Sequence, residues 1–175
     1  LLEILKEGAM DINDIERIDV GVYQDAQVFC DRLTPKTSLQ AKFSIQHALA
    51  AILLWGEPQL EHYTQTAFED KQCSELRGRI NIRVDQNIES VYPQHFGAKC
   101  TVALKNGQQI VRSQQDTLGD PEKPLSQTQR HKKAHMLLSH TGMSDDNITN
   151  LCAFDWSQSA PVSSFTALLR PLESH

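Results

Sequence analysis

The sequence predicts an α+β fold in which a small antiparallel sheet of three to four strands packs on one central buried helix, with additional short helices. Three observations lead to this class. The segment Ser38–Gly56 is apolar on every face of its second half, so other elements must wrap it. Two alternating segments are joined by Asn106-Gly107, which is typical of a tight hairpin. The elements follow in the order strand, helices, strand, hairpin, helices.

The N-terminal segments predict a helix followed by a strand. Leu1–Glu7 has apolar side chains at helical spacing, and Gly8 ends this pattern. Residues then alternate between apolar and polar, so Glu16–Cys30 is expected to form one long or interrupted strand with one buried face. Because the chain opens inside an apolar helical repeat, we expect a preceding segment in the natural protein, although a trimmed tag would leave the same pattern.

The central helix is marked at both ends. Thr37 or Ser38 can cap its start, and Gly56 followed by Pro58 can end it. At about 1.5 Å per residue the apolar half is too short to cross a bilayer. We therefore expect a helix buried in a protein core.

The remaining segments predict short elements. We expect helices at 58–68 and 70–77, a strand at 80–85, a loop at 87–97, hairpin strands at 99–105 and 108–117, helices at 126–139 and 144–154, and a terminal apolar helix at 165–172.

Composition excludes several classes of function. The 175 residues carry a net charge of −5 without charge blocks, and Lys and Arg do not cluster with aromatic residues, which argues against nucleic-acid binding. The four cysteines form no CxxC pair, which favours reduced thiols in a cytoplasmic compartment. No signal peptide or membrane-spanning stretch is evident. We expect a cytoplasmic protein without nucleic-acid or membrane partners.

The best candidate for a binding site is the first half of the central helix. Lys36 and Lys42 lie near its N-terminus, where free N–H groups favour a carboxylate. Ser44 and His47 would share one stripe that could face a pocket or an interface. The alternatives are lysines that extend from a core helix to solvent and a histidine whose hydrogen bonds are satisfied at a domain interface.

Other chemical motifs are weak. His131 and His135 in HKKAH are one helical turn apart, but the glutamate of an HExxH motif is missing, so we expect no metal. The sequence contains no phosphate-binding glycine loop, no GxSxG nucleophile motif and no catalytic residue that can be assigned. We expect no cofactor.

Four segments carry a resemblance to a known family, namely IERIDVGVY, PKTSLQAKFSIQHALAAILLWG, CTVALKNGQQIVRS and GDPEKPLSQTQ. In this order and at these separations they resemble the C-terminal region of the MmgE/PrpD family, which includes 2-methylcitrate dehydratase, cis-aconitate decarboxylase and iminodisuccinate epimerase. The resemblance implies an MmgE/PrpD C-terminal-like α+β domain over residues 1–155. Residues 156–175 are then a C-terminal tail with a short apolar segment.

The resemblance also implies a function. The chain would be the lid domain, or a stand-alone relative, of a cofactor-independent lyase or isomerase: a dehydratase, decarboxylase or epimerase of small di- or tricarboxylic acids. In the family that it resembles, a separate helical domain carries most of the catalytic residues, so we expect this chain alone to be inactive. The partners that we expect are a small polycarboxylate and either that helical domain or a second copy of the chain in a dimer. Residues 41–44 match the family's AKFS pattern, whereas His47 stands where a tyrosine is more usual. The alternative is a non-catalytic module that self-associates or binds small anions.

Overall fold

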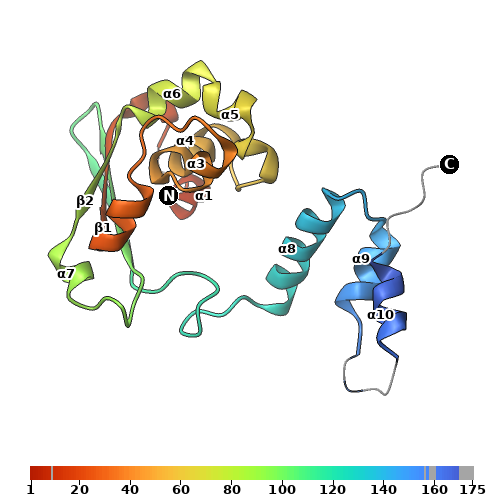
Figure 1. Ribbon diagram of the computed structural model, residues 1–175. Helices are drawn as coiled ribbons and strands as arrows, with labels where there is room; N and C mark the ends of the chain where they lie inside the picture. The colour runs from red at the N-terminus through yellow and green to blue at the C-terminus, as the bar shows by residue number, and fades with distance from the viewer. Residues whose placement is uncertain (9, 156, 158–160, 170–175) are drawn as a thin grey trace. The chain divides into compact units, whose positions relative to one another are not determined.

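The computed structural model describes residues 1–8, 10–155, 157 and 161–169. Contacts divide the chain after Lys123 into two compact units, Leu1–Lys123 and Pro124–His175 (Figure 1). The boundary that we predicted between residues 155 and 156 stays a prediction.

The first unit contains the sheet and most of the helices. In chain order its elements are α1 (Leu2–Lys6), η1 (Ile12–Asp14), β1 (Ile15–Val22), α2 (Gln24–Cys30), α3 (Ser38–Lys42), α4 (Ile45–Trp55), η2 (Leu60–Tyr63), α5 (Gln65–Glu69), α6 (Lys71–Arg77), β2 (Ile80–Val84), α7 (Gln86–Glu89), β3 (Ala98–Leu104) and β4 (Gln109–Gln114).

The four strands form a mixed sheet in the order β2-β1-β3-β4, which confirms the α+β class. The hairpin of β3 and β4 is antiparallel, as predicted from Asn106-Gly107. The expectation that every pair is antiparallel is wrong at β1 and β2, which run parallel with Ile18 opposite Ile80. The reason is the connection: the helices α2 to α6 form a long crossover that returns the chain to the starting end of β1.

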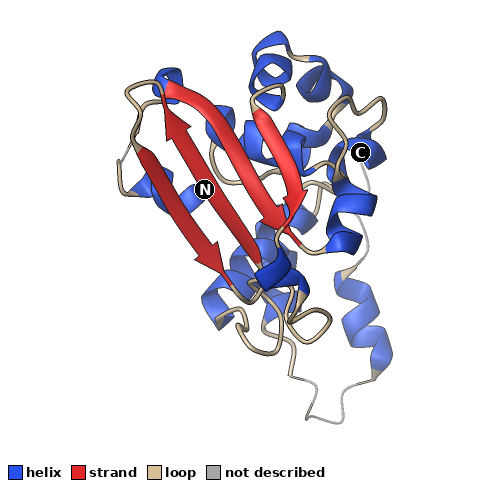
Figure 2. Cartoon of the chain, turned by 90° about the vertical axis from the view of Figure 1, so that its left-hand side faces the viewer, coloured by secondary structure: helices blue, strands red, loops and turns tan. Residues whose placement is uncertain are grey.

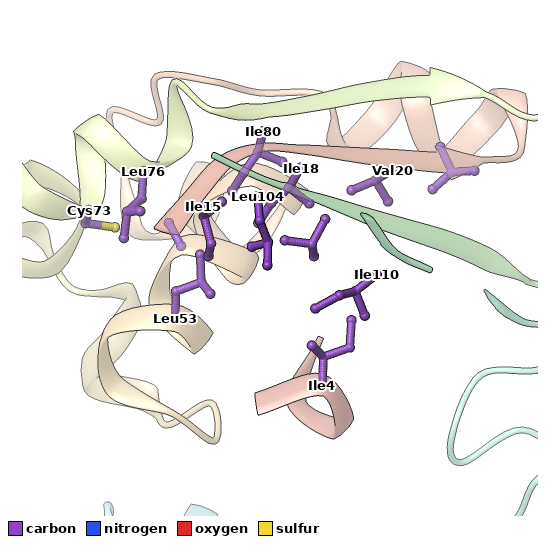
Figure 3. Packing of buried hydrophobic residues seen from close by; sticks show 13 residues of the cluster. Ile4, Ile15, Ile18, Val20, Leu53, Cys73, Leu76, Ile80, Leu104 and Ile110 are labelled. Atoms are coloured by element: carbon purple, nitrogen blue, oxygen red, sulfur yellow. The ribbon is translucent and has the colours of Figure 1, made fainter. Parts of the chain in front are cut away.

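The hydrophobic core of this unit lies between the sheet and the helices α1, α4 and α6 (Figure 2). Ile4 of α1, Leu53 of α4 and Leu76 of α6 point toward the sheet, where they meet residues such as Ile18 and Leu104 (Figure 3). All are at most 5% exposed. The central apolar helix is thus buried against the sheet, as its composition predicts.

The segment that we expected as one helix is in fact two, α3 and α4. Phe43 leaves the helical region with φ −101° and ψ 39°, and Ser44 is the N-cap of α4. The Ser44 hydroxyl accepts from the backbone N–H of His47 at 3.0 Å and donates to the carbonyl of Arg32 at 2.6 Å. A serine that bonds both the next turn and a distant loop ends one helix and starts another.

Three other expectations about elements are wrong. Residues after Val22 form helix α2 instead of continuing the strand, because the Glu89 carboxylate accepts from the first N–H of the helix, at Gln24, at 2.6 Å. Glu89 belongs to α7, which occupies part of the predicted loop at 87–97. The helix expected at 58–68 is divided at Thr64 into η2 and α5.

The second unit consists of α8 (Gln127–Ser139), α9 (Asp145–Cys152) and α10 (Val162–Leu168). Ser126 and Gln129 form a capping box at the start of α8, and Ser144 caps α9, so both predicted helix starts are confirmed. The predicted terminal helix at 165–172 extends beyond the described residues. Among the residues that are described, no helix has both the length and the apolar composition needed to cross a bilayer.

Candidate functional site

The two candidate lysines lie at opposite ends of the short helix α3. Lys36 precedes the helix, and its backbone N–H donates to the Gln40 side chain at 2.8 Å. Lys42 is the last residue of α3. Both side chains are exposed, so they place two positive charges on the surface of this element.

Ser44 lies inside the protein, where it organises the loop before α3. It is 2% exposed and is engaged by the backbone of Arg32 and His47, as described above. Its neighbour Gln46 is also buried; its amide accepts from the backbone N–H of Arg32 at 3.0 Å and donates to the Asp31 carboxylate. These polar side chains hold the loop from Asp31 onward against the first turn of α4.

His47 is completely buried, and both of its ring nitrogens have partners. Nε2 lies 2.7 Å from the carbonyl oxygen of His62, and Nδ1 lies 3.3 Å from Nη1 of Arg77. A guanidinium can only donate, so Nδ1 accepts and Nε2 carries the proton. His47 is therefore a neutral imidazole with a defined tautomer.

The surroundings of His47 favour this neutral form. Burial lowers its pKa, and the positive charge of Arg77 acts in the same direction, while the hydrogen bond to the His62 carbonyl opposes them. The thiol of Cys73 lies 3.5 Å from Nδ1, and burial raises the pKa of this thiol. Neither group is prepared as an accessible base or nucleophile.

Arg77, at the end of α6, is the functional candidate that the sequence did not reveal. Its side chain is 4% exposed, and Nη1 contacts His47 Nδ1 and Cys73 Sγ. Its Nε is buried without a hydrogen-bond partner among the described residues. Arg77 also lines a pocket of about 220 Å³ together with Lys36. No sequence motif marks this arginine, because its partner His47 lies on another helix, α4.

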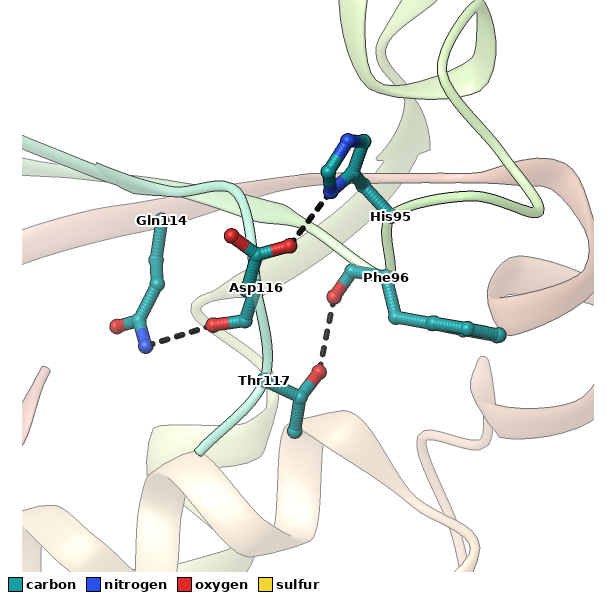
Figure 4. A network of polar contacts seen from close by, with 5 residues as sticks. All are labelled: His95, Phe96, Gln114, Asp116 and Thr117. Carbon is teal, nitrogen blue, oxygen red and sulfur yellow. Dashed lines mark hydrogen bonds and ion pairs between the residues drawn. The ribbon is translucent and has the colours of Figure 1, made fainter. Parts of the chain in front are cut away.

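A second polar cluster joins the segment after α7 to the end of β4 (Figure 4). His95 Nδ1 lies 2.6 Å from the Asp116 carboxylate, and the Thr117 hydroxyl donates to the carbonyl of Phe96 at 3.0 Å. The Gln114 amide donates to the Asp116 carbonyl at 2.9 Å. The first two interactions link the two segments, and the third lies within the segment at the end of β4, so we interpret the cluster as a structural tie.

The histidines of HKKAH do not form a metal centre with other described residues. His135 Nε2 lies 3.1 Å from Asp145, and its Nδ1 lies 3.2 Å from the Ser139 hydroxyl. Within the described part of the chain, no three His, Cys, Asp or Glu side chains gather in an arrangement suited to a metal ion.

Apolar side chains are exposed on consecutive segments of the first unit. They lie on α2, on the loop that follows it, on α3 and at its C-cap, and they are 48–66% exposed: Val28, Phe29, Leu33, Leu39 and Phe43. We refer to these five residues as the α2–α3 apolar residues. Docking surfaces are contiguous patches of exposed apolar side chains, and we take these five residues as candidates for one because they lie on successive segments.

The fold and these buried polar contacts define the first unit as an α+β domain with a mixed sheet and a cationic pocket beside its central helices. The family model described as MmgE/PrpD C-terminal domain matches residues 1–153 of this sequence. The chain therefore belongs to the MmgE/PrpD family, as its C-terminal domain. No curated protein matches the chain.

Proposed function

We propose that this chain is the lid domain of a cofactor-independent lyase or isomerase that acts on small di- or tricarboxylic acids. The observation that carries the proposal is the family match, which extends over residues 1–153 and so includes the whole sheet and its helices. The reaction would be a dehydration, decarboxylation or epimerisation beside a carboxylate.

The charges on α3 suit this role. Abstraction of a proton next to a carboxylate requires a positioned base and cationic groups that stabilise the developing negative charge. Lys36 and Lys42 are exposed and can supply positive charge at the domain surface. His47 is a poor candidate for the base, because both of its nitrogens are engaged inside the protein. We assign the catalytic base to the helical domain of the enzyme, and the cationic groups that face the substrate to the lid domain formed by this chain.

The α2–α3 apolar residues support a docking role. They adjoin Lys36 and Lys42 in the sequence, so an apolar contact surface and a cationic group belong to the same segment. A lid that closes over a charged substrate needs both: the apolar side chains hold the partner domain, and the lysines face the acid.

The proposal is tested by a fusion enzyme. Residues 1–153 would replace the C-terminal domain of an active family enzyme, and turnover of cis-aconitate and 2-methylcitrate would be measured. We expect turnover in the fusion and none in the isolated 175-residue chain. Lys42→Ala in the fusion should lower kcat/KM by about tenfold or more, since a cationic group near the substrate is lost.

Two results would contradict the lid function. One is turnover by the isolated chain above that of its own Lys42→Ala variant, which would show a complete active site within these residues. The other is a folded fusion protein that does not turn over any polycarboxylate of the family.

The exposed α2–α3 apolar residues also favour a second candidate, a module that forms homodimers through this surface. Light scattering of the purified chain tests it. A dimer that dissociates in Phe29→Ser with Phe43→Ser supports self-association, whereas a strict monomer at high concentration excludes it.

A further inference from the structure

A second pocket of the first unit lies at the C-terminal end of α4, and we call it the Trp55 pocket. Its volume is about 360 Å³, which is within the range of pockets that hold small ligands. It shares no lining residue with the pocket of Lys36 and Arg77. Its walls come from the end of α4, from η2, from α5 and from the N-cap of α6.

The Trp55 pocket carries negative charge. Glu61 and Asp70 line it, whereas none of its lining residues is a lysine or an arginine. In the described part of the chain, neither carboxylate forms an ion pair with a basic side chain. Oδ1 of Asp70 accepts from the backbone N–H of Cys73 at 2.7 Å, which holds this carboxylate in place. Two carboxylates without a cationic partner favour a positively charged ligand.

An aromatic wall indicates that this cation is organic. The indole of Trp55 is 38% exposed, and its centroid lies 5.2 Å from that of the His62 ring, with the two planes inclined by 38°. The face of an indole attracts organic cations, quaternary ammonium groups above all. The described residues provide no group of three His, Cys, Asp or Glu side chains suited to a metal ion. An open indole beside two carboxylates therefore favours an ammonium ligand.

His62 adds a directional donor to the same pocket. The residue is 9% exposed, and its Nδ1 accepts from the backbone N–H of Gln59 at 3.2 Å, so Nε2 carries a proton. Nε2 has no hydrogen-bond partner among the described residues, yet it is not one of their fully enclosed side-chain nitrogens that lack a partner. It therefore keeps contact with solvent, and the Trp55 pocket is the space that this ring lines. A ligand can satisfy Nε2–H with a hydrogen-bond acceptor.

We propose that the Trp55 pocket binds a small amino alcohol such as choline. The ammonium group lies against the indole of Trp55, Glu61 and Asp70 compensate its charge, and the hydroxyl oxygen accepts from Nε2 of His62. This site goes beyond the lid function, because its ligand is a cation and not an acid. The site lies within the first unit, so its binding is measured on this chain whether or not the fusion enzyme is active.

Calorimetric titration of the 175-residue chain with choline tests the proposal. We expect saturable binding to one site. Dimethylbutanol, the isostere in which a carbon atom replaces the charged nitrogen, should bind at least tenfold more weakly, because it lacks the positive charge. Tetramethylammonium keeps the charge but lacks the hydroxyl group, and it should bind about fivefold more weakly.

Fluorescence places the ligand in the pocket. The sequence contains two tryptophans, so Trp156→Phe leaves Trp55 as the single indole of the chain. We expect choline to change the emission of Trp55 in this variant, with the same midpoint as in calorimetry.

Two carboxylate variants test the charge of the pocket. Glu61→Gln should weaken choline binding about fivefold, because it removes a negative charge and keeps the shape of the side chain. Asp70→Asn should also weaken it, and asparagine can still cap α6. Glu75→Gln is the matched control, because Glu75 is an exposed glutamate of α6 that does not line the pocket. Circular dichroism checks that each variant is folded.

Four results would overturn the proposal. The first is the absence of saturable choline binding to the folded chain. The second is an equal affinity for dimethylbutanol, which would indicate apolar contact alone. The third is an equal affinity for tetramethylammonium, which would exclude the hydroxyl contact. The fourth is an equal loss in Glu61→Gln and Glu75→Gln, which would indicate general surface charge.

Discussion

At the scale of single residues, His47 shows how one side chain can connect several elements. It lies on α4, receives a hydrogen bond from Arg77 of α6 and contacts the backbone of η2 through His62. It is also in edge contact with the ring of Tyr63 at 5.5 Å. His47, which we considered as a residue that could face a binding site, therefore connects α4 to α6 and η2 and fixes the position of the Arg77 side chain.

The first prediction concerns pH. Because burial lowers the pKa of His47 in the folded protein, the unfolded chain binds a proton first as the pH falls. The contribution of neutral His47 to the free energy of unfolding is thus complete above the pKa of about 6.5 that histidine has in the unfolded chain. It decreases as the pH falls from there toward the lower pKa of His47 in the folded protein. One proton can change the free energy of unfolding by at most about 1.4 kcal/mol per pH unit.

Urea denaturation at pH 7.5 and pH 5.5 measures this effect. We expect the His47→Gln variant to lose less stability between these pH values than the wild-type chain does. His140→Gln, at an exposed position on the second unit, is the control and should behave as wild type. A wild-type difference that persists unchanged in His47→Gln would show that other groups cause it.

At the scale of elements, the break between α3 and α4 positions the pocket that Lys36 and Arg77 line. The Ser44 cap joins the first turn of α4 to Arg32, and the loop that follows Arg32 carries Lys36 toward α6. A continuous helix would leave this loop without its anchor. Two short helices with a serine between them therefore bring a surface lysine and a buried arginine to one pocket.

The second prediction follows from this cap. Ser44→Ala removes the N-cap of α4 and leaves the Arg32 carbonyl without its partner, so it should lower the free energy of unfolding by about 2 kcal/mol. The Thr37 side chain caps α3, where it accepts from the backbone N–H of Gln40 at 3.2 Å. Thr37→Ala removes this cap and should lower the free energy of unfolding by about 1 kcal/mol or less. Urea denaturation followed by circular dichroism compares them; a larger loss in Thr37→Ala would contradict our account of the break.

Local signals in the sequence were sufficient for some elements but not for others. The hairpin at Asn106-Gly107 and the start of α8 at Ser126 were predicted correctly, because turn and cap chemistry act within a few residues. The helix break at Ser44 depends on Arg32, and the start of α2 depends on Glu89, which lies far along the chain. Such partners cannot be identified from periodicity.

The candidate site shows the same limit. Lys36 was expected near a carboxylate site and does line a pocket, and the alternative of a buried histidine with satisfied hydrogen bonds describes the placement of His47. Arg77 was not expected, because α6 brings it to the pocket only through tertiary packing. The proposal that any of these residues contacts a substrate stays a prediction.

At the scale of the whole molecule, the core belongs to the first unit. Every residue of the main hydrophobic cluster lies between Ile4 and Ile110. The second unit has Ile148 as its buried core residue among those described, with Phe154 and Phe165 in edge contact at 5.2 Å. The sheet therefore packs on a cluster to which α8 to α10 contribute no residue among those described.

The third prediction is that residues 1–123 fold without the rest of the chain. This fragment should unfold cooperatively, with a midpoint within a few degrees of the sheet-containing transition of the full chain, because it retains the entire main cluster. Differential scanning calorimetry and near-ultraviolet circular dichroism check it. A fragment with helical content but no cooperative transition would show that the second unit is required.

The parallel pairing of β1 and β2 has a consequence for the route by which the protein reaches this fold. Both neighbours of β1 in the sheet, β2 and β3, are encoded after α6, so a ribosome releases β1 long before either partner exists. During that interval two unpaired edges and the apolar α4 are available to other nascent chains. Sheet assembly must wait for distant segments, which predicts slow folding and a need for chaperones during synthesis.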